Sequence, residues 1–232
     1  MLISEDVLFL HVPKTGGLSV TDYLLNDLKG AMTFSRGFKA NPDKVKTYAF
    51  EDVAGRVTTF HGRRHEDMAE AAAVLAGLGR ALSDFKLVFA VIRNPYDLEV
   101  SHYEHLRKQR VIRRRGENSR PVRAAATGDF GHFVRNAPFF GNLPPRIERY
   151  YTLDGSVPPN MQLVRFETMQ QVVPDIIAPH AFGRSAFPHF NVSTKRRPYR
   201  DYLTPEIEAA IYEKYRFLFD YYPRETVGPV AA

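Results

Sequence analysis

The chain has 232 residues, of which 44% are hydrophobic and 25% charged, a composition typical of a globular protein with one sizeable core. It contains no cysteine, which excludes disulfides, thiolate catalysis and cysteine-ligated zinc. A formal net charge of +6 predicts anionic partners, among them phosphate-bearing cofactors, acidic glycans, nucleic acid and membrane surfaces.

Nothing in the sequence predicts insertion into a membrane or export across one. No run of about 18 or more apolar residues occurs. Residues 1–6 lack the basic region and apolar run that open an export signal. We therefore expect a cytoplasmic protein without a membrane span, made of one domain over residues 1–223 and a C-terminal tail over 224–232.

The first half of the chain alternates apolar runs with segments of helical periodicity. Val7–Val12 is a short apolar run closed by Pro13, and Leu18–Leu28 has apolar residues at helical spacing. Val57–Phe60 predicts a second strand, and the alanine-rich segment Glu66–Leu82 predicts a second helix.

The same alternation continues through the second half. Phe85–Ile92 predicts a buried strand that stops at Arg93, and Pro95 suits the first turn of a helix running to about Arg110. Prolines and glycines between residues 136 and 159 predict loops. The remaining elements expected are a strand at Met161–Phe166, a helix at Glu167–Ile177 and a helix opened by Thr204-Pro205-Glu206. Together they predict an α/β fold with a P-loop-like central parallel sheet flanked by helices, in a single domain.

The first motif with chemical meaning is Pro13-Lys14-Thr15-Gly16-Gly17-Leu18-Ser19. A strand that ends in a glycine turn and feeds a helix directs backbone N–H groups and the positive helix end to one point, which suits an anion. The lysine precedes the glycines and the loop is short, so this is not the Walker pattern of magnesium-dependent kinases. An ordinary glycine turn with a surface lysine is the structural alternative.

The second motif is the turn Arg93-Asn94-Pro95, with Ser101 in the helix that follows. Arg93 is expected at the C-terminal end of a central strand, the edge where open α/β sheets bind ligands. Its planar guanidinium suits a phosphate, and Ser101 offers a further donor. A structural arginine that pairs with Asp97 explains the same residues.

Together these segments resemble a known family. His11–Gly17 resembles the 5′-phosphosulfate loop of the sulfotransferases that use 3′-phosphoadenosine 5′-phosphosulfate (PAPS), especially the heparan, dermatan and chondroitin branch and its bacterial relatives. Phe89–Asp97 with Ser101 is similar to that family's 3′-phosphate site. Later segments are also similar, namely Leu163–Glu167, His189–Ser193 and Tyr199–Tyr202. The resemblance implies a bacterial enzyme that moves a sulfuryl group from PAPS to a hydroxyl of a carbohydrate or small-molecule acceptor.

The resemblance also implies roles for individual residues. Lys14 would contact the phosphosulfate and stabilise the leaving group, and Arg93 with Ser101 would bind the 3′-phosphate. The 5′ side would be lined by Thr15, Gly16, Gly17, Leu18 and Ser19. Positioned donors can stabilise charge on the bridging oxygen without a metal, so we expect PAPS as co-substrate and no metal ion.

The base that takes the acceptor's proton has two histidine candidates. His61 precedes Gly62 and Arg63, a segment that resembles the family's His-Gly-His except that Arg63 replaces the second histidine. His65 resembles the helix-opening histidine of other branches. Placement at a strand end favours His61 as the base, with His65 or Glu66 next, and a structural role for both histidines stays open.

Three further features allow other interpretations. The basic stretch Arg107–Arg123 predicts either a solvated loop or a lid that binds the acceptor, and Lys195–Arg197 either a loop over the cofactor or an exposed turn. His102 and His105 are three residues apart on one expected helix, but no carboxylate trio accompanies them, which disfavours a metal site. The alternative functions are a P-loop-like nucleotide-binding protein or kinase and a module that binds polyanions. Nucleic acid is disfavoured because Arg107–Arg123 contains no aromatic residue.

Overall fold

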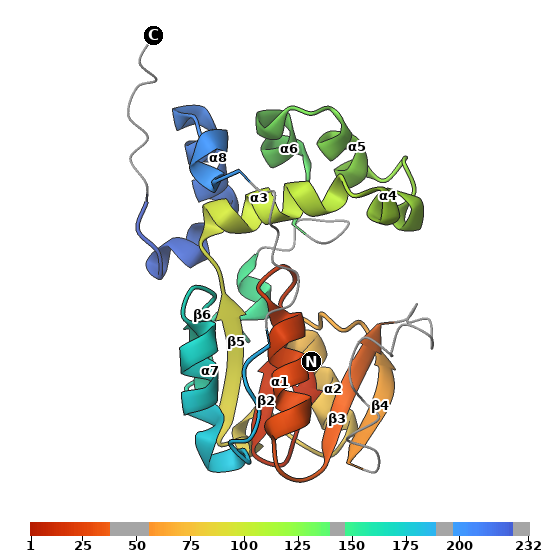
Figure 1. Ribbon diagram of the computed structural model, residues 1–232, viewed down its shortest axis with the longest axis vertical. Helices are drawn as coiled ribbons and strands as arrows, with labels where there is room; N and C mark the ends of the chain where they lie inside the picture. Colours follow the sequence, from red (N-terminus) through yellow and green to blue (C-terminus); the bar gives the residue numbers. More distant parts are fainter. Residues whose placement is uncertain (38–55, 140–146, 189–196, 225–232) are drawn as a thin grey trace. The chain divides into compact units, whose positions relative to one another are not determined.

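A computed structural model describes residues 1–37, 56–139, 147–188 and 197–224 (Figure 1). The chain divides into two compact units, which we treat separately. The sheet unit comprises Met1–Ile92 and Arg149–Val192, and the helical unit comprises Arg93–Glu148 and Ser193–Ala232. The domain limits 1–223 and 224–232 stay a prediction, and residues 225–232 lie outside the described part.

The sheet unit is built on six strands in the order β4-β3-β1-β2-β5-β6. Their bounds are β1 Leu2–Ile3, β2 Val7–Leu10, β3 Met32–Gly37, β4 Val57–Gly62, β5 Leu87–Ile92 and β6 Met161–Arg165. β1 is antiparallel to both of its neighbours, and the pairs β3–β4, β2–β5 and β5–β6 are parallel. The predicted α/β class with a central, mostly parallel sheet is confirmed, whereas β1 and β3 were not foreseen.

Helices cover both faces of this sheet. Side chains of α1 (Gly17–Asp27) and α7 (Met169–Ile177) share one apolar cluster with alternate residues of β2 and β5, among them Phe9 and Phe89. The intervening strand residues, such as Leu8 and Val88, are equally buried and belong to the opposite face, where Figure 1 shows α2. β2 and β5 are therefore buried on both sides, as their continuous apolar sequence predicts.

The N-terminus of α2 (Met68–Gly77) is set by a capping box. The carboxylate of Asp67 accepts from the backbone N–H of Glu70 at 2.9 Å, and the Glu70 carboxylate accepts from the N–H of Asp67 at 3.0 Å. The predicted helix over Glu66–Leu82 is therefore too long at both ends. Its last predicted residue, Leu82, begins a separate 3-10 turn, Leu82–Asp84.

A buried carboxylate holds the far end of α1. Asp27 has no exposed surface and accepts from three successive backbone amides, those of Gly183, Arg184 and Ser185, at 2.9–3.1 Å. This anchor ties the segment that follows α7 to the C-terminal end of α1.

The helical unit contains short helices around a buried ionic cluster. Its elements are α3 Pro95–Leu106, α4 Gln109–Arg115, α5 Arg120–Ala126, α6 Phe130–Asn136, the 3-10 turns Tyr199–Tyr202 and Arg216–Asp220, and α8 Pro205–Lys214. Glu99 on α3 has no exposed surface and accepts from the ammonium of Lys214 and the hydroxyl of Tyr215. The cluster joins α3 to the end of α8. Thr204 caps α8 and Pro205 opens it, as predicted.

The solvated loop expected for the basic stretch Arg107–Arg123 is wrong, because most of the stretch is helical. α3 ends at Leu106, and the basic stretch forms α4 and α5, each with a buried valine, Val111 and Val122. Arginine is a good helix former, so an arginine-rich stretch with a few buried apolar residues is compatible with a helix as well as with a loop. The expected irregular structure near residues 136–159 is confirmed where the structure describes it, apart from the one 3-10 turn Ile147–Tyr150. No helix in the described segments is both long and apolar enough to span a membrane.

Candidate functional site

The loop between β2 and α1 has a strained backbone at the predicted lysine. Lys14 adopts φ 66° and Gly16 adopts φ 80°, so two of three successive residues lie in the left-handed region. A residue with a side chain is uncommon there and costs on the order of 1 kcal/mol or more, so the surrounding fold must hold Lys14 in this conformation. Thr15, between them, is fully buried, and its hydroxyl donates to the carbonyl of Val12 at 3.0 Å. This hydrogen bond therefore stabilises the turn of the loop between Val12 and Thr15.

The start of α1 carries positive character that no side chain of its own offsets. Gly16 is the N-cap residue and makes no side-chain cap, and the first turn contains no acidic residue. Among the first-turn amides, that of Ser19 donates to the carbonyl of Gly16 at 3.0 Å, whereas those of Gly17 and Leu18 come before the first hydrogen bond within the helix. Together with the helix dipole they make this end suitable for an anion, as the sequence predicted.

Both glycines are also required by packing. A Cβ atom at Gly16 would lie 2.7 Å from Cε of Met169, and one at Gly17 would overlap the imidazole of His11. Gly17 has ordinary helical geometry, so its lack of a side chain is explained by the histidine ring. The His11 ring thus packs as a wedge between the end of β2 and the first turn of α1.

His11 is 4% exposed, and its Nδ1 atom has no hydrogen-bond partner among the described residues. Burial lowers the pKa of His11 well below its ordinary value, because an imidazolium would lose its hydration, and the neighbouring His65 acts in the same direction. His11 is therefore neutral at physiological pH. Its ring stands edge-on to that of His65, with 4.7 Å between the ring centroids.

His65 is held by the backbone of His11. Its Nδ1 atom lies 2.8 Å from the His11 carbonyl oxygen. A carbonyl only accepts, so Nδ1 must carry the hydrogen and Nε2 the lone pair. Burial lowers the pKa of His65 to about 4, although part of the residue remains exposed. The imidazole is thus neutral, and the hydrogen bond to the His11 carbonyl fixes its tautomer.

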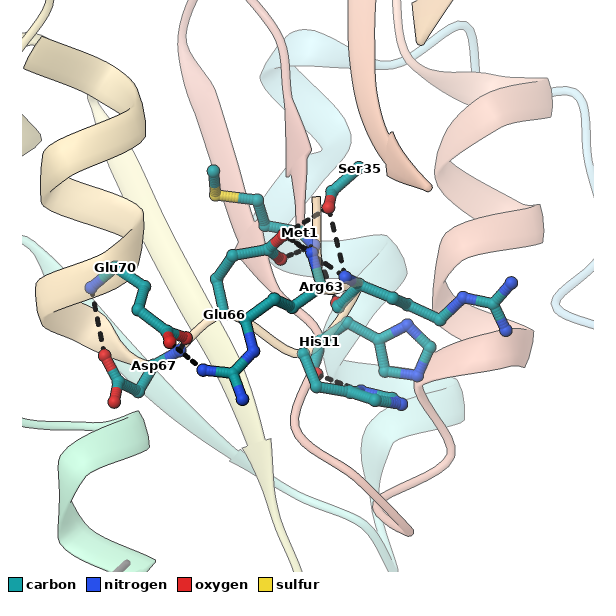
Figure 2. Close-up of polar contacts among 9 residues, drawn as sticks. Met1, His11, Ser35, Arg63, Glu66, Asp67 and Glu70 are labelled. Carbon is teal, nitrogen blue, oxygen red and sulfur yellow. Dashed lines mark hydrogen bonds and ion pairs between the residues drawn. The ribbon is translucent and has the colours of Figure 1, made fainter. Parts of the chain in front are cut away.

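The turn before His65 is organised by Glu66 (Figure 2). The carboxylate is 3% exposed and accepts from the N-terminal ammonium of Met1 at 2.9 Å, from the amides of Arg63 and Arg64 at 2.8 and 3.2 Å, and from the hydroxyl of Ser35. Burial alone would raise the pKa of Glu66, but the ammonium and the hydrogen-bond donors outweigh it and hold the pKa below its usual value. A carboxylate engaged in this way is unsuited to the role of base that sequence left open for it.

His61 lies elsewhere in the sheet. It pairs with Arg36 near the end of β4, an edge strand that β3 and β1 separate from β2. Its side chain lies outside the described part. His65, four residues later, is the candidate that contacts the end of β2, and its role as well as that of His61 stays a prediction.

In the helical unit, the two residues expected at a 3′-phosphate lie together. Arg93 is 8% exposed, and its Nη1 atom is 3.3 Å from Oγ of Ser101. Its Nε donates to Oδ2 of Asp97 at 2.6 Å. The contact with Asp97 agrees with a structural role for Arg93, and the contact with Ser101 agrees with the predicted phosphate site.

Other predicted features are accounted for in part. No group of three or more histidine, aspartate or glutamate residues with the geometry of a metal site occurs in residues 1–37, 56–139, 147–188 and 197–224. His102 is fully buried against the rings of Phe133 and Phe139. Leu163–Glu167 comprises the end of β6 and the turn after it, and Tyr199–Tyr202 is a 3-10 turn. The segment His189–Ser193 and the residues Lys195 and Arg196 lie outside the described part.

No protein-family model matches the chain, and no curated protein is significantly similar to it. Among solved structures, the chain is similar to the crystal structure of a sulfotransferase from Alicyclobacillus acidocaldarius. The two share 17% identity, the match covers 97% of this chain and 98% of that chain, and the TM-score is 0.42.

The contact between Gly17 and His11 yields a stability prediction. Gly17→Ala should lower the free energy of unfolding by about 1–3 kcal/mol, because the new methyl group displaces the His11 ring. Gly77→Ala, at the open end of α2, is the matched control and should be neutral or slightly stabilising. Urea denaturation measures both. His11→Ala combined with Gly17→Ala should cost less than the sum of the two single changes, and strict additivity would contradict the wedge.

Proposed function

We propose that this protein is a PAPS-dependent sulfotransferase that acts on a hydroxyl group of a carbohydrate or small molecule and releases adenosine 3′,5′-bisphosphate. The observation that carries the proposal is the loop between β2 and α1. There a lysine held at positive φ precedes an uncapped helix N-terminus, and the residue that opens the loop, His11, holds a neutral histidine in one tautomer. The resemblance of residues 11–17, and of residues 89–97 with Ser101, to the family's donor motifs supports PAPS as the anion.

The donor's 5′ end is assigned to the loop. Lys14 provides a cation, and the amides of Gly17 and Leu18 at the start of α1 provide donors for the phosphosulfate oxygens. Gly16 and Gly17 keep side chains away from this backbone, with Leu18 and Ser19 completing the turn.

The donor's 3′-phosphate is assigned to Arg93 and Ser101. Arg93 directly follows Ile92, the last residue of β5, and β5 is the parallel neighbour of β2. The C-terminal ends of parallel neighbours lie at one edge of a sheet, which is where both motifs leave it. Asp97 holds Nε of Arg93, and the contact with Ser101 brings a second donor beside the guanidinium.

The proposed reaction is an in-line transfer with balanced bonds. The acceptor hydroxyl gives its proton to Nε2 of His65 while its oxygen bonds to sulfur, and the bond between sulfur and the bridging phosphate oxygen breaks. The charge released on that phosphate oxygen is met by Lys14 and the helix amides. The Nδ1–H of His65 keeps its hydrogen bond to the His11 carbonyl, which stabilises the imidazolium that forms.

Donor recognition predicts a dependence on the 3′-phosphate. Adenosine 3′,5′-bisphosphate should bind at least about tenfold more tightly than adenosine 5′-monophosphate, a difference of about 1.4 kcal/mol. Arg93→Lys should narrow this ratio because an ammonium cannot donate bidentately, whereas Arg113→Lys, at an exposed position of α4, should not. Calorimetric titration measures the affinities. Equal affinities in the wild type, or tight binding of ATP with magnesium instead, would favour the kinase alternative.

Catalysis predicts a specific loss at the loop lysine. Lys14→Ala should lower kcat by about 10²-fold or more, the usual cost of removing one charge-stabilising donor. Lys29→Ala, an exposed lysine just beyond α1, should leave kcat unchanged. A sulfuryl-transfer assay with PAPS measures both, and wild-type activity in Lys14→Ala would remove this lysine from the mechanism.

The assignment of the base predicts a pH dependence. His65 must be neutral to accept a proton, and its pKa is lowered to about 4, so kcat/KM should stay level near neutrality and fall only toward pH 4. His65→Ala should lower kcat by about 10²- to 10⁴-fold and abolish this acidic limb. His61→Ala is measured beside it. If His61→Ala shows the larger loss and His65→Ala retains the limb, the strand-end assignment is the correct one.

A further inference from the structure

We propose that Glu66 and Ser35 are positioning residues that hold the turn Arg63–His65, and with it the orientation of the His65 imidazole. The inference rests on the proposed role of His65 as base. Neither residue is assigned a contact with donor or acceptor. Both act through the backbone of the turn.

The contacts converge on two consecutive amides. The Glu66 carboxylate accepts from the N–H groups of Arg63 and Arg64, and the Ser35 hydroxyl accepts from the N–H of Arg64 at 3.1 Å while donating to the same carboxylate. Arg64, the residue directly before His65, adopts φ 70°. A left-handed arginine is unfavourable in isolation, so the turn keeps this shape because its amides are bound.

The packing leaves these groups little freedom to move. A Cβ atom at Gly62 would overlap both Oγ of Ser35 and Oε1 of Glu66, so hydroxyl and carboxylate lie directly against the backbone where β4 ends. Ser35 belongs to β3, and its own N–H donates to the carbonyl of Met1 at 3.0 Å. The sheet thus holds the Ser35 hydroxyl in place, and this hydroxyl accepts from the turn Arg63–His65.

Charge balance keeps the anchor in its accepting form. The Met1 ammonium and the Glu66 carboxylate are 2.9 Å apart, and their side chains are 0% and 2% exposed. An ionised carboxylate offers lone pairs only, which matches the four donors around it. Loss of the Glu66 side chain would leave the amides of Arg63 and Arg64 without this acceptor, and a change to glutamine would remove the negative charge that pairs with the Met1 ammonium.

Two sets of contacts described above support the position of His65. At the side-chain end, Nδ1 donates to the His11 carbonyl. At the backbone end, the turn is held by Glu66 and Ser35. Releasing the turn should let the imidazole rotate away from the carbonyl, so that the Nδ1–H tautomer is no longer the only one.

The test compares Ser35→Ala and Glu66→Gln with the wild type, all tagged at the C-terminus because the Met1 ammonium is buried. Nitrogen-15 NMR of the His65 imidazole reports the tautomer, and steady-state kinetics report kcat and the donor KM. Asp27→Asn is the matched control, since this buried carboxylate also binds successive amides but at the other end of α1. It should lower the melting temperature without altering the His65 signals.

We expect the wild type to show the Nδ1–H tautomer and both variants to show a mixture. The expected loss in kcat is about tenfold for Ser35→Ala and about 10²-fold for Glu66→Gln, with donor KM changed less than about twofold. If Glu66→Gln does not fold, Ser35→Ala, which keeps every charge, carries the test. Unchanged His65 signals in a folded variant, or the same change in Asp27→Asn, would overturn the proposal. A tautomer shift in a protein that transfers no sulfuryl group supports the positioning role and refutes the proposed function instead.

Discussion

The arrangement of the candidate site depends on one hydrogen bond, from Nδ1 of His65 to the carbonyl oxygen of His11. It joins residues 54 positions apart, and it connects the loop after β2 to the turn that leads into α2. Because the acceptor is a backbone carbonyl, the bond fixes a tautomer as well as a position. The side chain of the same His11 forces glycine at position 17. A single residue therefore shapes both the start of α1 and the histidine beside it.

The distribution of buried charge follows from the cost of desolvation. Burial lowers the pKa of His11 and of His102, because an imidazolium would lose its hydration, and both imidazoles are therefore neutral. Buried carboxylates remain charged only with partners at hand, as Glu66 does with the Met1 ammonium and Glu99 with Lys214. The protein thus combines neutral histidines with fully satisfied carboxylates. In such a setting a histidine is better suited than a carboxylate to accept a proton.

The sequence predicted those elements whose signals are local. The strand-loop-helix unit around Lys14, the buried strand β5 and the cap at Thr204 all follow from short-range patterns. β1 is two residues long and shows no periodicity, and β3 was missed with it. Those two strands separate β4 from β2, so the end of β4 that carries His61 is not next to the loop in the sheet order. His61 was preferred to His65 because it ends a predicted strand, and that preference did not take the order of the strands in the sheet into account. Contacts such as that of Ser35 with Glu66 join residues far apart in the chain, and no sequence pattern predicts them.

The lowered pKa fits the proposed chemistry of His65. Burial makes a charged imidazolium costly, so the neutral form prevails. PAPS would bring several negative charges to the adjacent loop, and a nearby anion raises the pKa of an imidazole. The proton affinity of His65 would then increase once the donor is bound, which is when the acceptor hydroxyl must be deprotonated. Burial and donor charge, acting in opposite directions on one group, would make the base effective only in the complex that can react.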